Sequence, residues 1–159
     1  MRPNLKHCSE PLTPLDTHGK TPWNPSRRAL KRVKDRVEIP CICPYCRGLV
    51  NITHHQVIYG GKQYGEWPWV YACEDCDAYV GMHPFTNLPL GTLADGVTRK
   101  ARTKAKAAFN RYWQSRGMSR NDGYHWLAQQ LGIEKSKCHI GWSDTAQCER
   151  IIQVCQEAT

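Results

Sequence analysis

The sequence predicts an α+β protein in which a small zinc ribbon, built on a β-hairpin sheet, packs against about three α-helices. Three observations predict this class. Two Cys-x-x-Cys pairs stand in one short segment, at 43–46 and 73–76. The residues around them are rich in β-branched and aromatic strand formers. The last third of the chain carries apolar residues at steps of three and four, which is the period of an amphipathic helix.

The chain divides into three predicted segments: an extended, basic, Pro-rich arm at 1–38, the zinc ribbon at 39–91 and the helical region at 92–159, packed on the ribbon. A length of 159 residues suits one compact unit or a metal module with a helical annex. No run approaches ~18 apolar residues, and the N-terminus has no apolar leader region. We therefore expect no membrane contact and a reducing cytoplasm. In that compartment the clustered cysteines, among 9 in the chain, are expected to be metal ligands rather than bridges.

In the arm, prolines interrupt helix formation at 3, 11, 14, 22 and 25. A basic helix is then predicted over 26–37, with Ser26 as its N-cap. Its cations are predicted to contact phosphates, and the alternative is a solvated charged face. These cations are Arg27, Arg28, Lys31 and Arg32. A second metal site at His7, Cys8 and His18 is a weaker alternative, because its spacing fits no standard pattern.

One structural Zn²⁺ is predicted at the two Cys-x-x-Cys pairs. Each pair forms a tight turn that presents two thiolates to one point, and four thiolates at tetrahedral positions suit zinc. The four ligands are Cys43, Cys46, Cys73 and Cys76. The 26 residues between the pairs exceed the usual gap, which a β-hairpin would absorb. Two disulfides or an iron–sulfur cluster are the alternatives, and Cys41 is expected to be a buried apolar residue rather than a ligand.

Strands are predicted around 50–59 and 67–73, joined by a turn at 60–65, and a third strand continues through 77–81. His54 and His55 are weak metal-ligand candidates, since four thiolates already fill a tetrahedral site. Most of the aromatic residues are expected to fill the core. Tyr64 and Trp67, nearest the hairpin tip, are predicted to stack on unpaired bases.

A long basic helix is predicted over 93–115, starting at the capping pattern of Thr92 and Asp95. Its apolar face is expected to dock on the ribbon, which leaves the basic face outside. The predicted phosphate contacts on it are Arg99, Lys100, Arg102, Lys104 and Lys106. Gly117 ends this helix. A second helix is predicted from Ser119 to Gly132 and a third from near 143–144, so the spacing fails the helix-turn-helix pattern.

The loop before the last helix contains Cys138 and His139. His139 together with His83 is a weak candidate for a catalytic or metal site, and the alternative is a packed loop whose histidine bonds to the backbone. The sequence shows no paired carboxylates at a metal-binding spacing and no nucleophile–base pattern. We therefore do not expect an enzyme.

Four motifs occur together in order: Cys43-Pro-Tyr-Cys46, Cys73 through Pro84, Pro89 through Asp95, and Cys138-His139-Ile-Gly141. This set resembles a family of small zinc-finger-containing proteins of phages and bacteria. The resemblance covers about 39–155 and implies a zinc-ribbon core and a phage or prophage setting, and it supplies no activity. The arm lies outside it. The family often has a cysteine before the His-Pro pair where this chain has Met82, which weakens a second metal at His83.

The net charge of +8, from 22 Lys and Arg against 14 Asp and Glu, favours a polyanionic partner. The leading hypothesis is a zinc ribbon that binds DNA or RNA, with its basic helix and arm on phosphates. The first alternative is a protein-interaction module that binds a host machine such as RNA polymerase, the ribosome or a defence complex. The second is a metal-dependent nuclease that uses His83 and His139.

Overall fold

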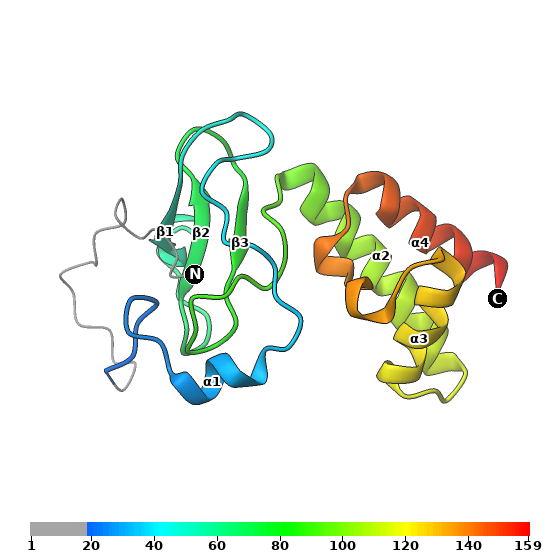
Figure 1. Cartoon of the computed structure of the whole chain (residues 1–159). Helices are drawn as coiled ribbons and strands as arrows, with labels where there is room; N and C mark the ends of the chain where they lie inside the picture. Colours follow the sequence, from blue (N-terminus) through cyan, green and yellow to red (C-terminus); the bar gives the residue numbers. More distant parts are fainter. Residues whose placement is uncertain (1–18) are drawn as a thin grey trace. The chain divides into compact units, whose positions relative to one another are not determined.

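The computed structural model describes residues 19–159, and this part of the chain forms two compact units, the first ending at Asp95 and the second spanning Gly96–Thr159 (Figure 1). The first unit holds a three-stranded sheet and the second is helical, so the α+β class is confirmed. Within 19–159, no helix has the length and apolar character needed to span a bilayer. The predictions for Pro3, Pro11, Pro14 and the His7–Cys8–His18 site fall outside the described residues.

The sheet is antiparallel in the order β1-β2-β3, which confirms the predicted hairpin and third strand. Its strands are β1 (Val50–His54), β2 (Trp69–Cys73) and β3 (Tyr79–Gly81). Val50 lies opposite Cys73 at one end of the hairpin. At the other end His54 is followed by a 3-10 turn, η2 (His55–Val57), instead of the predicted continuation of the strand.

The first unit buries its central strand. Trp69 and Tyr71 are each only 2 % exposed, because the segment after β3 folds back over β2. The Tyr71 hydroxyl donates to the Asn87 carbonyl at 2.5 Å, and the Trp67 indole donates to the Thr86 carbonyl at 3.0 Å. Three of the six aromatic residues within 59–79 are therefore buried: Trp67, Trp69 and Tyr71. Tyr79 is half-buried and Tyr59 and Tyr64 are exposed, so the expectation that most of these residues fill the core holds for only half of them.

The described part of the arm packs on the ribbon core. Trp23 lies edge-on to Trp69 with ring centroids 5.4 Å apart, and the Ser26 N–H donates to the Phe85 carbonyl at 2.9 Å. These two tertiary contacts were not expected of a Pro-rich arm.

The basic helix of the arm, α1 (Arg27–Arg32), is shorter than predicted, although its Ser26 N-cap is confirmed. The helix ends because Val33 is extended, and the Leu30 carbonyl accepts both the Val33 N–H at 3.3 Å and Nη2 of the Arg36 guanidinium at 2.7 Å.

The second unit consists of α2 (Gly96–Ser115), α3 (Arg120–Leu131) and α4 (Thr145–Glu157), with two 3-10 turns between α3 and α4. The Ser119 cap and the Gly132 terminus of α3 are confirmed, and Asp144 caps α4 in a capping box. The predicted start of α2 at 93 is wrong. Ala94 instead pairs with Tyr79 in a short antiparallel bridge at the edge of β3, so the helix begins only at Gly96.

The core of the second unit lies where the three helices meet. Phe109 of α2 and Leu127 of α3 are fully buried, and Ile151 of α4 is 2 % exposed. The apolar face of α2, which was expected to dock on the ribbon, is filled by α3 and α4. The packing of this helical region on the ribbon stays a prediction.

Candidate metal centre

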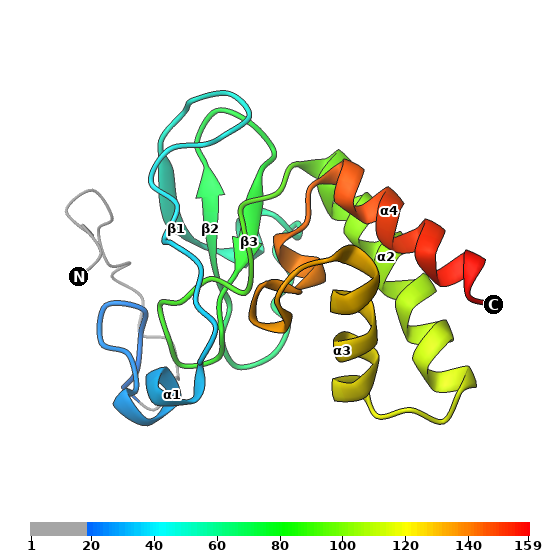
Figure 2. The same cartoon turned by 45° about the vertical axis from the view of Figure 1, so that its right-hand side comes forward.

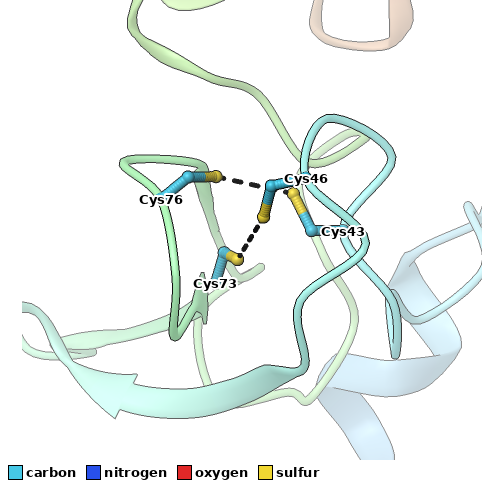
Figure 3. Close-up of side chains that lie close together, drawn as sticks. All are labelled: Cys43, Cys46, Cys73 and Cys76. Atoms are coloured by element: carbon cyan, nitrogen blue, oxygen red, sulfur yellow. Dashed lines mark hydrogen bonds between the residues drawn. The ribbon is translucent and has the colours of Figure 1, made fainter.

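The four predicted ligands converge on one point. Cys43 and Cys46 come from the turn before β1, Cys73 is the last residue of β2, and Cys76 lies in the turn that follows it (Figure 3). All four sulfur atoms lie within 4.8 Å of one another. The Sγ atoms of Cys43 and Cys76 are 3.6 Å apart, and those of Cys46 and Cys73 are 3.4 Å apart.

Local sequence shapes both turns. Arg47 adopts a left-handed backbone with φ of 68°, which brings the chain round so that the Cys43 N–H donates to the Gly48 carbonyl at 2.8 Å. A Cβ atom on Gly48 would run into the Asp75 carboxylate of the second turn. Glycine at 48 therefore lets the two cysteine-bearing turns approach closely.

Backbone N–H groups point at the sulfur atoms. The Gly48 N–H donates to Cys46 Sγ and the Asp75 N–H to Cys73 Sγ, each at 3.4 Å. Such donors stabilise thiolate charge and orient the ligands. Among the described residues that carry histidine, cysteine or acidic side chains, these four cysteines form the only group close enough to hold a metal ion together.

The thiol pKa values show the cost of grouping four cysteines. Burial raises the pKa of Cys43, but N–H groups of Cys46 and Tyr45 outweigh it and the pKa falls below 9.0. At Cys76 the Ala78 N–H lowers the pKa, but burial and the three neighbouring cysteines raise it by more, and the pKa rises from 9.0 to about 12. A coordinated metal ion reverses this balance, because a thiol that binds the ion loses its proton outright.

The site fits zinc. Four bonds of about 2.3 Å to a central ion give a tetrahedron with edges of about 3.8 Å, close to the observed separations. The cysteines are not bridged, which sets the disulfide alternative aside, and the spacing of the four sulfurs suits a single ion rather than a cluster. The four cysteines hold a structural Zn²⁺, and with every position taken by a thiolate the ion has no open position for a substrate.

Neighbouring candidates play other parts. Cys41 is exposed and stands outside the ligand group, so the prediction that it is buried is wrong. His55 is buried, which lowers its pKa, and its Nε2 accepts from the Tyr64 N–H at 3.0 Å. His54 is likewise outside the ligand group, and burial lowers its pKa too.

The predicted phosphate contacts on α1 are all exposed: Arg27, Arg28, Lys31 and Arg32. On α2, Lys100, Lys104 and Lys106 are exposed, and Arg99 is half-buried. Arg102 is half-buried, and its Nε donates to the Ser143 carbonyl at 2.8 Å, so it ties α2 to the start of α4. Arg111, further along α2, is also an exposed cation, although it was not among the predicted contacts.

Trp67 does not suit its predicted role. It is 9 % exposed and its indole N–H is bound inside the ribbon core, so no ring face is free to stack on a base. Tyr64, at 59 % exposure, is the exposed aromatic residue of that turn. Period-2 alternation did not indicate this difference, because the loop that covers Trp67 comes from a later segment of the chain.

The Cys138–His139 loop is packed. Burial raises the pKa of the Cys138 thiol to about 11, so it is protonated at neutral pH. His139 stacks on Trp142 with ring centroids 4.2 Å apart, and its Nε2 lies 3.0 Å from the Ser136 carbonyl. His83 belongs to the first unit and His139 to the second, and their joint role stays a prediction.

Comparison with known families agrees with this site. Residues 39–158 match a family described as a zinc-finger-containing domain, and the match covers most of the chain, so the chain belongs to that family. Comparison with curated proteins and with solved structures gave no match.

Proposed function

We propose that this zinc-finger-containing domain serves as the scaffold of a nucleic-acid-binding protein that contacts phosphates mainly through α2. The observation that carries the proposal is the charge of that helix. The phage or bacterial setting that the motifs imply is part of the same proposal and rests on the resemblance alone.

Helix α2 has six cations in 20 residues and no acidic side chain. Lys100 and Lys104 are four residues apart, as are Arg102 and Lys106, and such like-charge pairs destabilise a helix by a few tenths of a kcal/mol. Most of the cations also lie in the half nearest the positive end of the helix dipole, where acidic side chains are favoured. A row of phosphates would relieve both costs.

Three of these cations form one exposed stripe: Lys100, Lys104 and Arg111. Steps of four and seven residues keep them on one side of the helix. At 1.5 Å per residue the stripe spans about 16 Å, which is long enough to follow several successive phosphates of one strand. The four exposed cations of α1 offer a second contact of the same kind on the first unit.

Contacts of this kind position a protein on nucleic acid without reading its sequence. We therefore expect binding that is strongly salt-dependent and tolerant of sequence. The exposed ring of Tyr64 would add affinity for single strands, because an exposed aromatic face stacks on any unpaired base.

The test is a salt titration of binding, followed by fluorescence anisotropy with labelled duplex DNA, single-stranded DNA and RNA. The triple variant Lys100→Gln, Lys104→Gln and Arg111→Gln should lower the slope of log affinity against log salt by about 2.7 for duplex DNA, since each lost phosphate contact removes about 0.9. Affinity should fall alike on unrelated sequences.

A control triple, Lys62→Gln, Lys135→Gln and Lys137→Gln, removes the same charge from outside α2. It should change the slope by much less. Equal losses in the two triples would show that general basicity, and not α2, drives binding. No binding to any of the three nucleic acids at low salt would refute the proposed function.

One surface favours the alternative of a protein-interaction module. Ile42 and Leu49 face each other across the first cysteine turn and are 43 % and 49 % exposed. If a host protein binds there, a pull-down from lysate should keep its partner after nuclease treatment and lose it with Leu49→Asp.

A further inference from the structure

The second unit contains a cavity of about 530 Å³ that the proposed nucleic-acid contacts do not use. It lies among the C-terminal end of α3, the loop with the 3-10 turns η3 (Lys135–Lys137) and η4 (Ile140–Trp142), and the first turns of α4. Figure 2 shows this loop in orange, between the end of α3 and the start of α4. Its volume falls within the range of small-molecule sites.

Local sequence builds the cavity walls. Gly132, with φ of 66°, ends α3 and turns the chain back, so that the Ile133 N–H donates to the Ala128 carbonyl at 3.1 Å. Leu127 and Leu131 are one turn apart on α3 and therefore face the cavity together. Arg150 and Ile151 reach it from α4.

The deep lining is apolar. Leu127 is fully buried, and Ile140 and Ile151 are 5 % and 2 % exposed, yet all three line the cavity. At the rim Ile133 is 44 % exposed, an aliphatic surface that the fold leaves uncovered. An apolar lining of this kind favours a ligand with an apolar part, because binding removes the apolar surfaces of both the ligand and the cavity from water.

The rim is positively charged. Lys137 and Arg150 are exposed cations that line the cavity, and its lining contains no aspartate or glutamate. Lys137 forms an ion pair with Glu134, with 3.9 Å between its Nζ and the Glu134 Oε2. Within residues 19–159 Arg150 forms no ion pair, so its guanidinium is available to an anion from outside. Guanidinium groups bind carboxylates and phosphates with two parallel hydrogen bonds.

We propose that this cavity binds a small amphiphilic organic anion, with its apolar body against Leu127, Ile140 and Ile151 and its anionic group on Arg150. The Cys138–His139 motif is then part of the wall rather than a reactive pair. The stacked rings of His139 and Trp142 hold the loop side of the cavity in place. This inference is independent of nucleic-acid binding, because none of the α2 stripe lines the cavity.

The test uses ¹⁵N-labelled, zinc-loaded full-length protein and a set of matched probes followed by NMR. The probes are 2-naphthoate, the neutral 2-naphthamide, acetate and adenosine monophosphate. We expect 2-naphthoate to shift amide signals of residues 127–151 and to bind about tenfold more tightly than 2-naphthamide, since a charge-assisted hydrogen bond is lost with the amide. Acetate, which lacks the apolar body, should bind far more weakly.

The matched variants are Arg150→Gln and Arg111→Gln, both at exposed helical arginines. Arg150→Gln should weaken 2-naphthoate about tenfold and leave 2-naphthamide unchanged, whereas Arg111→Gln should change neither. Equal binding of acid and amide, equal effects of the two variants, tighter binding of the mononucleotide, shifts centred outside 127–151, or no binding of 2-naphthoate would each overturn the proposal.

Discussion

Loss of one zinc ligand should unfold the first unit and leave the second folded. The perturbation is Cys46→Ser, at an exposed ligand, so the change removes a zinc–sulfur bond without emptying the core. A structural zinc contributes roughly 10–16 kcal/mol of apparent folding free energy. Whole domains are stable by only about 5–15 kcal/mol. The ribbon should therefore unfold rather than merely weaken.

The second unit should survive because its core is made from its own three helices. Helices α2, α3 and α4 are 20, 12 and 13 residues long, against 6 for α1, so almost all the helical signal belongs to the second unit. Circular dichroism at 222 nm should thus change little. NMR signals of β1, β2 and β3 should collapse to random-coil positions, and zinc content should fall from about one per chain to near zero.

Cys41→Ser is the matched control, since Cys41 is also exposed and stands two residues from Cys43 outside the ligand group. It should keep its zinc and its sheet. A Cys46→Ser protein with an intact sheet would refute the metal's structural role. Loss of the helical signal along with the sheet would refute the independence of the second unit, and treatment of the wild type with a chelator should reproduce the variant.

Two further predictions concern the helical unit. Gly123→Ala should destabilise it by about 1–3 kcal/mol in chemical denaturation, because the added Cβ would meet Trp113 Cβ at 2.9 Å. Gln130→Ala, on the exposed side of the same helix, should be close to neutral. Burial raises the pKa of Cys138 and of Cys155 to about 11. The unfolded chain loses these protons from pH 9 upward, so stability should be full below pH 9 and fall between pH 9 and 11, with a shallower fall when both are alanine.

If the Gly123→Ala protein were as stable as wild type, the first of these predictions would be contradicted, and α2 and α3 would have to move apart at little cost in free energy. For the second, a stability curve that is unchanged by removing both thiols would show that other groups cause the alkaline loss. Chemical denaturation followed by helical circular dichroism measures the free energy of unfolding for both predictions, and for the thiols it is repeated at each pH.

The metal centre could be predicted from the sequence because its information is local. Each Cys-x-x-Cys pair is a complete turn, and the zinc chemistry follows from four thiolates. The caps at Ser26 and Ser119 were predictable for the same reason, since a cap is decided within four residues. Gly132 ends its helix where a left-handed residue is needed.

What was missed depends on contacts distant in sequence. Trp23 packs on Trp69 across 46 residues, so the arm joins the ribbon although its prolines argue against order. The Thr92 capping pattern was overridden by a bridge from Ala94 to Tyr79. The cavity could not be predicted for the same reason. Cys138 and His139 of its wall stand out in the sequence, but the residues of α3 and α4 that complete the wall are brought there by tertiary packing.

The opposition of Val50 and Cys73 across the hairpin has a consequence for how the sheet is selected during folding. A slip by one residue would carry Cys73 about 3.4 Å along its neighbour and turn its side chain to the opposite face. The tetrahedron could not close around the ion in that state. Zinc binding therefore selects the strand register. Only the correctly paired hairpin is stabilised by the binding free energy, whereas a misaligned hairpin cannot bind the ion and unfolds again.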